Sequence, residues 1–248
     1  MNGGNTLSSF LSGEKKGGKC CALIAAAGVG SRMNCEGSKV LLPIGNKPVL
    51  VLTLEAFQAC RSIDSVVVVT RHEDIFYIAE LCKKYNLQKV NTVVAGGKTR
   101  TDSVKEGLSH IDESFKYVAV HDGARPFITP KCIDDVVLAA KEYGAAAAGV
   151  HVLDTVKKCD AQIFILETVD RRDLWFVQTP QVFERGLLIS AYDNTEKNNI
   201  EITDDCMAVE SLNIKIKMVE CGYENIKITT PFDLITAQKI IKLRGEST

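Results

Sequence analysis

The sequence has no surplus of charge of either sign. The 30 lysines and arginines nearly balance the 31 aspartates and glutamates, which leaves a formal net charge of −1. A surface that binds polynucleotides needs a basic surplus, so nucleic acid is not an expected partner and any nucleotide ligand would be a small molecule. No apolar run approaches the roughly 18 residues of a spanning helix, so no membrane association is expected.

The sequence also lacks a cysteine-based metal or redox pattern. None of the 9 cysteines forms a C-x-x-C pair, and no histidine stands at zinc-binding spacing from a cysteine. An odd number of scattered cysteines is typical of buried or idle thiols in a reducing compartment. We therefore expect free thiols and a cytoplasmic location.

Residues 1–18 are rich in glycine, serine, asparagine and lysine, and their only apolar patch is Leu7–Leu11. This patch is too short and too polar for the apolar region of a signal peptide, so we expect a disordered leader. Residues 19–248 contain no repeat and no low-complexity tract. With 46% hydrophobic and 25% charged residues overall, they are expected to form a single globular domain.

Short β-branched runs alternate with segments of helical period through the first part of this region. The alternation predicts a Rossmann-like three-layer α/β/α fold, with a mostly parallel mixed sheet covered on both faces. Ligands of such folds bind beyond the carboxyl ends of the strands. The expected strands are Cys20–Ala26, Ser65–Thr70, Lys89–Ala95, Tyr117–His121 and Ala146–Val150, and the expected helices are Val49–Cys60, Asp74–Tyr85, Thr101–His110 and Pro130–Tyr143.

The alternation breaks at residues 151–172, where two β-like stretches flank the turn-prone Cys159-Asp160-Ala161. This pattern predicts a projecting β-hairpin arm. An arm with apolar faces and no core of its own packs on another surface, so we expect it to form a homodimer. After the arm we expect capping segments at Gln178–Gln181 and Ile202–Asp205, a strand at Lys215–Glu220, and helices at Glu184–Tyr192, Asp204–Leu212 and Pro231–Leu243.

A glycine-rich loop, Ala26-Ala27-Gly28-Val29-Gly30-Ser31-Arg32-Met33, directly follows the first strand. Its glycines can take positive φ, its backbone N–H groups can bind an anion, and Arg32 and Lys39 add positive charge. Met33 replaces the third glycine of a dinucleotide fingerprint, and the loop lacks the Gly-Lys-Ser/Thr end of a P-loop. The loop predicts a site for the phosphates of a nucleoside triphosphate; tight packing alone is the alternative.

Two later segments carry charged residues at or within strand-like stretches. His121-Asp122-Gly123-Ala124-Arg125 follows an apolar run, so Asp122 would lie at the ligand edge, where a carboxylate suits Mg²⁺. Arg125 would either pair with Asp122 or bind a substrate phosphate. We interpret His121 as a packed residue and not a general base. Lys227 lies between the strand-like Ile226 and Ile228, a pattern that by itself favours a solvated strand lysine.

Taken in order, these motifs resemble those of the 2-C-methyl-D-erythritol 4-phosphate cytidylyltransferase family. The resemblance runs from about residue 20 to the end of the chain. It implies transfer of CMP from CTP to 2-C-methyl-D-erythritol 4-phosphate, giving 4-diphosphocytidyl-2-C-methyl-D-erythritol and pyrophosphate. The motifs are the glycine-rich loop with Lys39, Leu42–Leu50, Gly96–Val104, His121–Phe127, Thr168–Gln181 and Asn225–Thr229.

The resemblance also implies a role for each site residue, with Mg²⁺ as the cofactor at Asp122. Substrate residues on the arm would complete the active site of the neighbouring subunit. The implied catalytic residues are Arg32, Lys39 and Lys227; the nucleotide-binding residues are Ala26, Ala27, Gly28, Gly30, Gly97, Ser103 and Asp122; the substrate-binding residues are Arg125, Thr155, Arg171 and Thr203.

Two positions depart from the family pattern: Lys98 stands where we expect an acidic residue, and Asp205 where we expect glutamate. Two other functions remain open, namely a ribitol 5-phosphate or similar polyol-phosphate cytidylyltransferase and a non-catalytic nucleotide-binding domain. The second is disfavoured, since a degenerate copy would have lost some of the charged residues at the expected site. A dehydrogenase is disfavoured because Thr70-Arg71, and not an acidic residue, closes the second strand.

Overall fold

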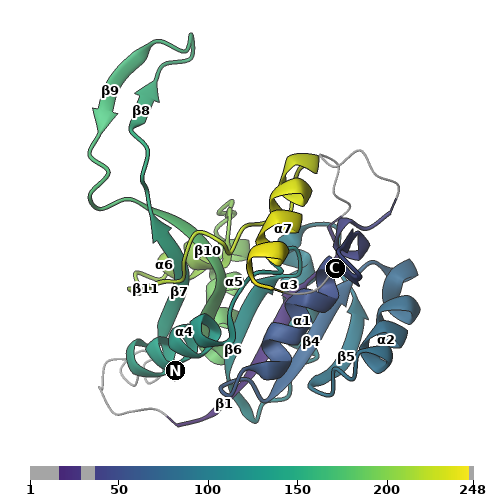
Figure 1. Ribbon diagram of the computed structural model, residues 1–248. Coiled ribbons are helices and arrows are strands. Elements are labelled where there is room, and N and C mark those ends of the chain that lie inside the picture. The colour runs from purple at the N-terminus through teal and green to yellow at the C-terminus, as the bar shows by residue number, and fades with distance from the viewer. Residues whose placement is uncertain (1–16, 29–36, 246–248) are drawn as a thin grey trace, which may run out of the picture.

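The computed structural model describes residues 17–28 and 37–245, and its centre is a seven-stranded sheet in the order β11-β7-β10-β6-β1-β4-β5 (Figure 1). Only β10 runs antiparallel to its neighbours in this sheet, so the predicted mostly parallel mixed sheet is confirmed. The strands are β1 (Lys19–Ala25), β4 (Ser65–Thr70), β5 (Val90–Ala95), β6 (Phe115–Asp122), β7 (Ala145–His151), β10 (Trp175–Glu184) and β11 (Lys217–Glu220); a small hairpin pairs β2 (Pro43–Ile44) with β3 (Lys47–Pro48).

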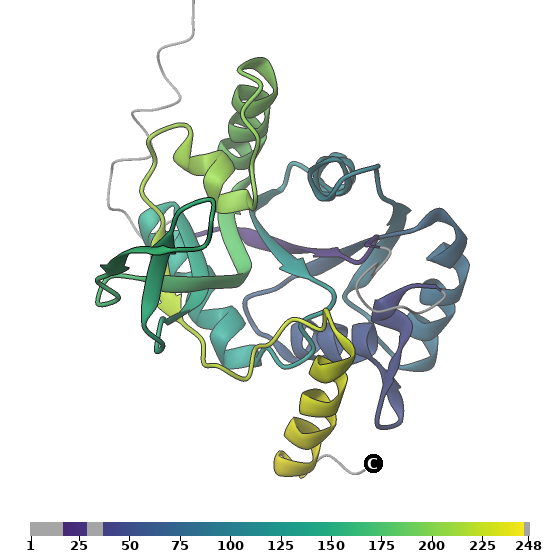
Figure 2. The same ribbon diagram turned by 90° about the horizontal axis from the view of Figure 1, so that it is seen from above.

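Helices cover both faces of the sheet, as the alternation predicts (Figure 2). β1 shows why: Cys20, Ala22 and Ile24 face one core, whereas Cys21 and Leu23 face the other. One layer holds α1 (Val49–Ala59), α2 (Ile75–Lys84), α4 (Pro130–Tyr143) and α7 (Pro231–Leu243), and the other holds α3 (Arg100–Ser109), α5 (Arg185–Lys197) and α6 (Asp205–Glu210).

Capping side chains mark the start of α3, α4, α6 and α7. Thr129 caps α4 with Pro130 at the first turn, and Gly144 ends this helix with φ 90°. Thr230 and Asp233 form a capping box that begins α7. Both helices have the predicted bounds, because their stop and start signals are local in the sequence.

Two expectations for the second half of the chain are wrong. Gln178–Gln181 is not a capping segment but lies inside β10, where the register against β7 shifts between Val177 and Gln181. This irregularity and its buried polar side chains hide the strand in the sequence. Asn225–Thr229 forms no strand; Ile228 donates one backbone hydrogen bond to Ala124, at 2.8 Å, and the rest connects β11 to α7.

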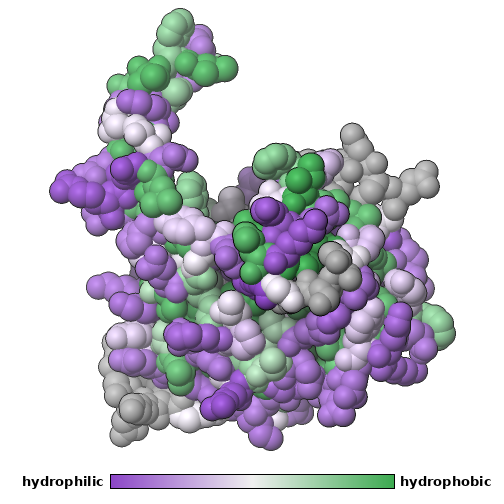
Figure 3. All heavy atoms as spheres, in the orientation of Figure 1, coloured by the Kyte–Doolittle hydropathy of each residue, from purple (hydrophilic) through white to green (hydrophobic). Residues whose placement is uncertain are grey.

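The predicted arm is present as an antiparallel hairpin of β8 (Val156–Cys159) and β9 (Ile165–Val169) that extends away from the body (Figure 1). Its turn is held by Asp160, whose carboxylate accepts backbone hydrogen bonds from Gln162 and Phe164. Apolar side chains gather at the tip (Figure 3), where Ile163 is 83% and Phe164 71% exposed.

The cysteines differ from expectation in one respect. Cys132 in α4 and Cys221 after β11 form a disulfide, with 5.4 Å between their Cα atoms, so the expectation of free thiols is wrong for this pair. The two are 89 residues apart in sequence, and only the packing of α4 beneath β11 brings them together. The other cysteines of the described part are free.

No helix of residues 17–28 and 37–245 is long and apolar enough to cross a membrane. The predicted leader lies outside the described residues over positions 1–16.

Candidate active site

The turns after β1, β5 and β6 emerge together at the carboxyl edge of the sheet. Backbone hydrogen bonds continue the ladder just past the strands: Ala26 donates to Val69 at 2.7 Å, Gly96 to Thr70 at 2.7 Å, and Gly123 to Ala25 at 2.9 Å. A cavity of about 260 Å³ opens at this edge. It is lined by Ala25, Ala26, Ala27, Gly28, Lys39, Val40, Gly97, Lys98, Thr99, Arg100, Ser103, Asp122, Ala124 and Lys227.

A second cavity, of about 470 Å³, lies between the β2–β3 hairpin, α1 and α7. Its charged side chains already have partners: Lys47 contacts Glu55 of the same cavity at 2.7 Å, and Arg244 contacts Glu224 outside it at 2.8 Å. It offers no convergent lysines for a polyphosphate. We therefore place the candidate active site in the smaller cavity, although the other is larger.

Two glycines bring the loop after β5 against α3. A Cβ at Gly96 would stand 2.6 Å from the hydroxyl of Ser103 and 2.8 Å from the methyl group of Ala27, and one at Gly97 would stand 2.3 Å from Cβ of Asp102. Only glycine fits such approaches. The predicted Gly97 and Ser103 thus do lie in the pocket wall with Ala27.

The structure describes part of the glycine-rich loop. Ala26, Ala27 and Gly28 line the pocket, but Gly28 does not have positive φ. The predicted Gly30 and Arg32 lie outside the described residues. Lys39, at the start of a short 3₁₀ turn (Lys39–Leu41), lines the pocket as predicted.

Asp122 ends β6 at the centre of the pocket. Lys227 Nζ lies 2.8 Å from Asp122 Oδ2, Arg125 Nε lies 3.5 Å from the same oxygen, and Arg100 Nε lies 3.5 Å from Oδ1. Burial raises the pKa of Asp122, but the charges of Lys227, Arg100 and Arg125 outweigh it and hold this pKa well below its usual range. The carboxylate is therefore ionised.

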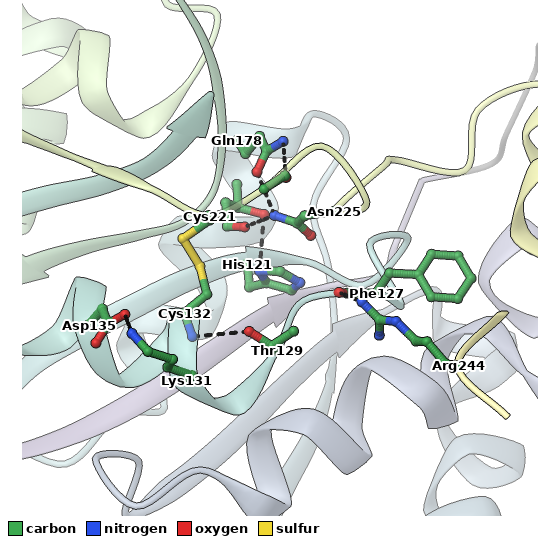
Figure 4. The surroundings of a disulfide bond; sticks show 12 residues. His121, Phe127, Thr129, Lys131, Cys132, Asp135, Gln178, Cys221, Asn225 and Arg244 are labelled. Atoms are coloured by element: carbon green, nitrogen blue, oxygen red, sulfur yellow. Dashed lines mark hydrogen bonds and ion pairs between the residues drawn. A yellow bond between two sulfur atoms is a disulfide. The ribbon is translucent and has the colours of Figure 1, made fainter. Parts of the chain in front are cut away.

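Lys227 reaches Asp122 from an anchored connecting segment. The Asn225 side-chain amide donates to the Gln178 side-chain oxygen at 2.9 Å and to the Thr179 carbonyl at 3.0 Å (Figure 4). Arg125 donates from Nη1 to the Asn225 carbonyl at 2.8 Å. The segment is thus tied to β10 and to the turn after β6, which places Lys227 over the pocket.

His121 is a buried packing residue, as interpreted from the sequence. Its ring lies 4.9 Å from that of Phe57, and burial lowers its pKa to about 3. The Thr179 hydroxyl accepts the Asp122 N–H at 3.0 Å and lies 3.1 Å from His121 Nδ1. The Thr179 hydroxyl therefore donates its own proton to His121 Nδ1. The ring proton of His121 is on Nε2, which donates to the Arg125 carbonyl at 3.3 Å.

The sequence reasoning missed Arg100 and Tyr192 and left Asp205 without a role. Arg100 Nη1 and Nη2 donate to the two carboxylate oxygens of Asp205 at 2.8 and 2.7 Å. The Tyr192 hydroxyl donates to the same carboxylate, which is fully buried. Arg100 stands within the predicted Gly96–Val104 motif, a signal that could have marked it, whereas nothing in the sequence marks Tyr192.

The predicted substrate residues do not gather around the pocket within this chain. Arg125 lies beside Asp122 but pairs with it and with Asn225. Thr203 is exposed in the segment before α6, and Thr155 and Arg171 flank the arm strands β8 and β9 and do not line the pocket. Their roles in substrate binding stay predictions.

Asp122 fits the donor set that Mg²⁺ takes from a nucleotide enzyme. This ion usually binds one or two carboxylates and completes its shell with phosphate oxygens and water. Residues 17–28 and 37–245 contain no cluster of three or more histidine, cysteine, aspartate or glutamate side chains that would hold a metal alone. A single ionised carboxylate at this pocket is compatible with a metal that would arrive with a triphosphate.

A Rossmann-like sheet whose carboxyl edge combines glycine-rich turns, convergent lysines and one aspartate defines an α/β nucleotidyltransferase. Comparisons with known proteins narrow the class. Residues 20–243 match the family of 2-C-methyl-D-erythritol 4-phosphate cytidylyltransferase. The chain belongs to this family.

Individual relatives agree with the match. The cytidylyltransferase of this name from Clostridium botulinum (strain Langeland) is 42% identical over 90% of this chain and 98% of its own length. That from Clostridium novyi (strain NT) is 44% identical over 90% and 97%. The crystal structure of 4-diphosphocytidyl-2C-methyl-D-erythritol synthase from Anaerococcus prevotii has a TM-score of 0.81 at 31% identity, covering 91% of this chain and 96% of its own. The Thermus thermophilus enzyme has a TM-score of 0.74 at 31% identity over 90% and 99%.

Proposed function

We propose that this protein transfers CMP from CTP to 2-C-methyl-D-erythritol 4-phosphate and releases pyrophosphate. One observation carries the proposal: Lys39, Lys227 and Asp122 converge on a single pocket with the turns that contain Ala26–Gly28 and Gly97–Ser103. Family membership supports the choice of nucleotide and acceptor.

In the proposed reaction, an oxygen of the acceptor phosphate attacks the α-phosphorus of CTP. A new P–O bond forms, the bond from the α-phosphorus to the bridging oxygen breaks, and pyrophosphate leaves with that electron pair. Both reacting groups are anionic, so the protein's main tasks are to neutralise charge and to hold an in-line geometry. No covalent intermediate with the protein is needed.

The lysines supply the positive charge. Lys39 lies at the pocket wall, and the ammonium of Lys227 can turn from Asp122 to a phosphate oxygen within the same cavity. Both charges would stabilise the five-coordinate transition state and the leaving pyrophosphate. Mg²⁺, held by Asp122 and the triphosphate, would supply further charge neutralisation.

The other wall suits a pyrimidine base. Cytosine presents an exocyclic amine as donor and O2 and N3 as acceptors. Backbone groups of Ala26, Ala27 and Gly97 at the pocket can meet both kinds of partner. Ser103 is buried there and donates its hydroxyl to the Thr99 carbonyl at 2.8 Å, which leaves its oxygen as an acceptor for the base amine.

The arm supports the proposal of a homodimer. It extends from the body, and its apolar residues Ile163 to Leu166 are 60–83% exposed with no core of their own. A twofold partner would cover this tip and receive Thr155 and Arg171 at its own pocket. Sedimentation velocity tests this: we expect a dimer, with Phe164→Ser shifting the protein toward monomer. A monomer at micromolar concentration would contradict the proposal.

A pyrophosphate-release assay tests the reaction. We expect turnover with CTP, Mg²⁺ and 2-C-methyl-D-erythritol 4-phosphate, little with ATP, and loss of turnover when EDTA removes the metal. Equal use of ATP would contradict the cytosine assignment. Faster turnover with ribitol 5-phosphate would replace the acceptor but keep the reaction class.

A further inference from the structure

A largely buried ion network reaches the pocket wall through Arg100 and joins three helices of one layer. Arg100 is the first residue of α3, and its terminal nitrogens hold both oxygens of Asp205 at the start of α6, at 2.8 and 2.7 Å. The hydroxyl of Tyr192, from α5, donates to Oδ1 of the same carboxylate. α3, α5 and α6 lie on the same side of the sheet (Figure 2).

The Nε–H group of the Arg100 guanidinium points at the candidate metal ligand, Asp122. Arg100 Nε lies 3.5 Å from Oδ1 of Asp122, whereas Lys227 and Arg125 contact Oδ2. Different side chains therefore contact the two oxygens of Asp122. A carboxylate contacted on both oxygens keeps the plane of its carboxyl group fixed.

Arg100 and Lys227 differ in how easily each side chain can move away from Asp122. Lys227 makes its 2.8 Å contact with one ammonium on a flexible stem. Arg100 has both terminal nitrogens committed to Asp205, whose side chain is 0% exposed. Turning Arg100 toward a phosphate would leave a buried carboxylate without its cation, which is strongly unfavourable. Arg100 thus stays in place while Lys227 moves.

We propose that Arg100, held by Asp205 and Tyr192, is a positioning residue that keeps the Asp122 carboxylate oriented toward the nucleotide when Lys227 moves to the triphosphate. The proposal rests on the proposed function for the presence of Mg²⁺ and CTP. Arg100 lines the pocket, but in this proposal it acts through Asp122 and not by binding the substrate. It also gives Asp205, which stands where glutamate was expected, a defined task.

Three variants test the proposal. Arg100→Lys keeps the charge but cannot hold two oxygens of Asp205 and reach Asp122 at once. Tyr192→Phe removes only the hydroxyl. Arg71→Lys is the matched control, because Arg71 also holds an aspartate, Asp74, through Nε and Nη2 at 2.7 and 3.0 Å, and does not line the pocket.

Titration calorimetry measures CTP binding with and without Mg²⁺, beside kcat and thermal unfolding. For Arg100→Lys we expect Mg²⁺-dependent CTP binding and kcat to fall by about 10–100-fold, the range for residues that orient a metal ligand, with Mg²⁺-free binding unchanged. Tyr192→Phe should shift both quantities in the same direction by less. It keeps the proposal testable should Arg100→Lys fail to fold. Arg71→Lys should change neither.

Other outcomes overturn the proposal. An equal loss of Mg²⁺-free binding would make Arg100 a nucleotide contact, and an equal loss in Arg71→Lys would reduce its role to general stability. Wild-type-like binding and kcat in both Arg100→Lys and Tyr192→Phe would leave the network without a function. If the wild type binds Mg²⁺ and CTP but releases no pyrophosphate, the proposed function fails, and the binding comparison still decides the role of Arg100.

Discussion

The pocket and the arm differ in how the positions of their side chains are determined. At the pocket, buried contacts determine the position of Asp122: three cationic side chains contact its oxygens, and Thr179 holds its backbone N–H. On the arm, the charged and apolar side chains are exposed, and the hairpin packs on no core of its own. A buried network can orient groups by itself, whereas an exposed hairpin needs a partner surface to give its side chains fixed positions.

The largest expected effect belongs to the pocket. Lys39→Ala and Lys227→Ala each remove a phosphate-directed charge, so kcat should fall by about 10²–10³-fold, as when one transition-state donor is lost. Pyrophosphate release with saturating CTP measures this. Lys47→Ala is the control, because that lysine pairs with Glu55 outside the pocket. Turnover near wild type in either pocket variant would remove that lysine from the mechanism.

A smaller loss is expected on the arm, where Arg171→Ala should lower kcat/KM for the polyol phosphate by about 10–100-fold through loss of a phosphate contact. The effect should act across the dimer. When Arg171→Ala and Lys39→Ala subunits exchange, one of the two sites in a hybrid keeps both side chains, so about a quarter of the wild-type rate should return.

Activity of the hybrid dimers shows whether Arg171 acts at the pocket of its own chain or at that of its partner. If Arg171 served the pocket of its own chain, each site of a hybrid would lack one of the two residues and no activity would return. Native mass spectrometry confirms that subunits have exchanged. Absence of rescue after confirmed exchange would contradict an active site shared between subunits.

The difference between the regions also explains what the sequence could predict. The strand ends of a parallel sheet meet at one edge, so the order of the motifs alone places Asp122 and Gly97 at a common site. Lys39 could be added because it follows the glycine-rich loop after the first strand. The capping signals of α4 and α7 are local and gave correct bounds.

Long-range pairings were not predictable. Arg100 and Asp205 are 105 residues apart, and the disulfide joins cysteines 89 residues apart. Neither pairing leaves a local pattern, because each depends on how helices pack on the finished sheet. β10 was missed for a related reason: its polar residues Gln178 and Gln181 are buried and satisfied by Asn225 and Asp204, which only the fold supplies.

The disulfide gives a prediction confined to the body. Reducing Cys132–Cys221, or Cys221→Ser, should lower the free energy of unfolding by about 2–4 kcal/mol, since a long loop loses its cross-link. Urea unfolding with and without dithiothreitol measures it, with Cys159→Ser on the arm as the control. Because Asn225 anchors Lys227 independently, kcat in the absence of urea should stay near wild type. A fall in kcat as large as that of Lys227→Ala would contradict this anchoring.

The smallest expected effect compares two aspartates of lowered pKa, one in the body and one on the arm. In the α7 cap, burial raises the pKa of Asp233, but hydrogen bonds from Thr229 and Thr230 outweigh it and lower this pKa. On the arm, the side-chain hydrogen bond from exposed Arg172 lowers the pKa of Asp170. A depressed folded-state pKa adds stability above the unfolded pKa of about 4, which is lost as pH falls through the folded value.

Asp233→Ala should therefore lower the free energy of unfolding by about 1 kcal/mol at pH 7, as for a lost helix cap, and flatten the acid limb of the stability profile. Asp170→Ala should leave urea unfolding unchanged at every pH, because the arm adds no buried core to the body; an equal loss in both variants would show that the arm folds as part of it.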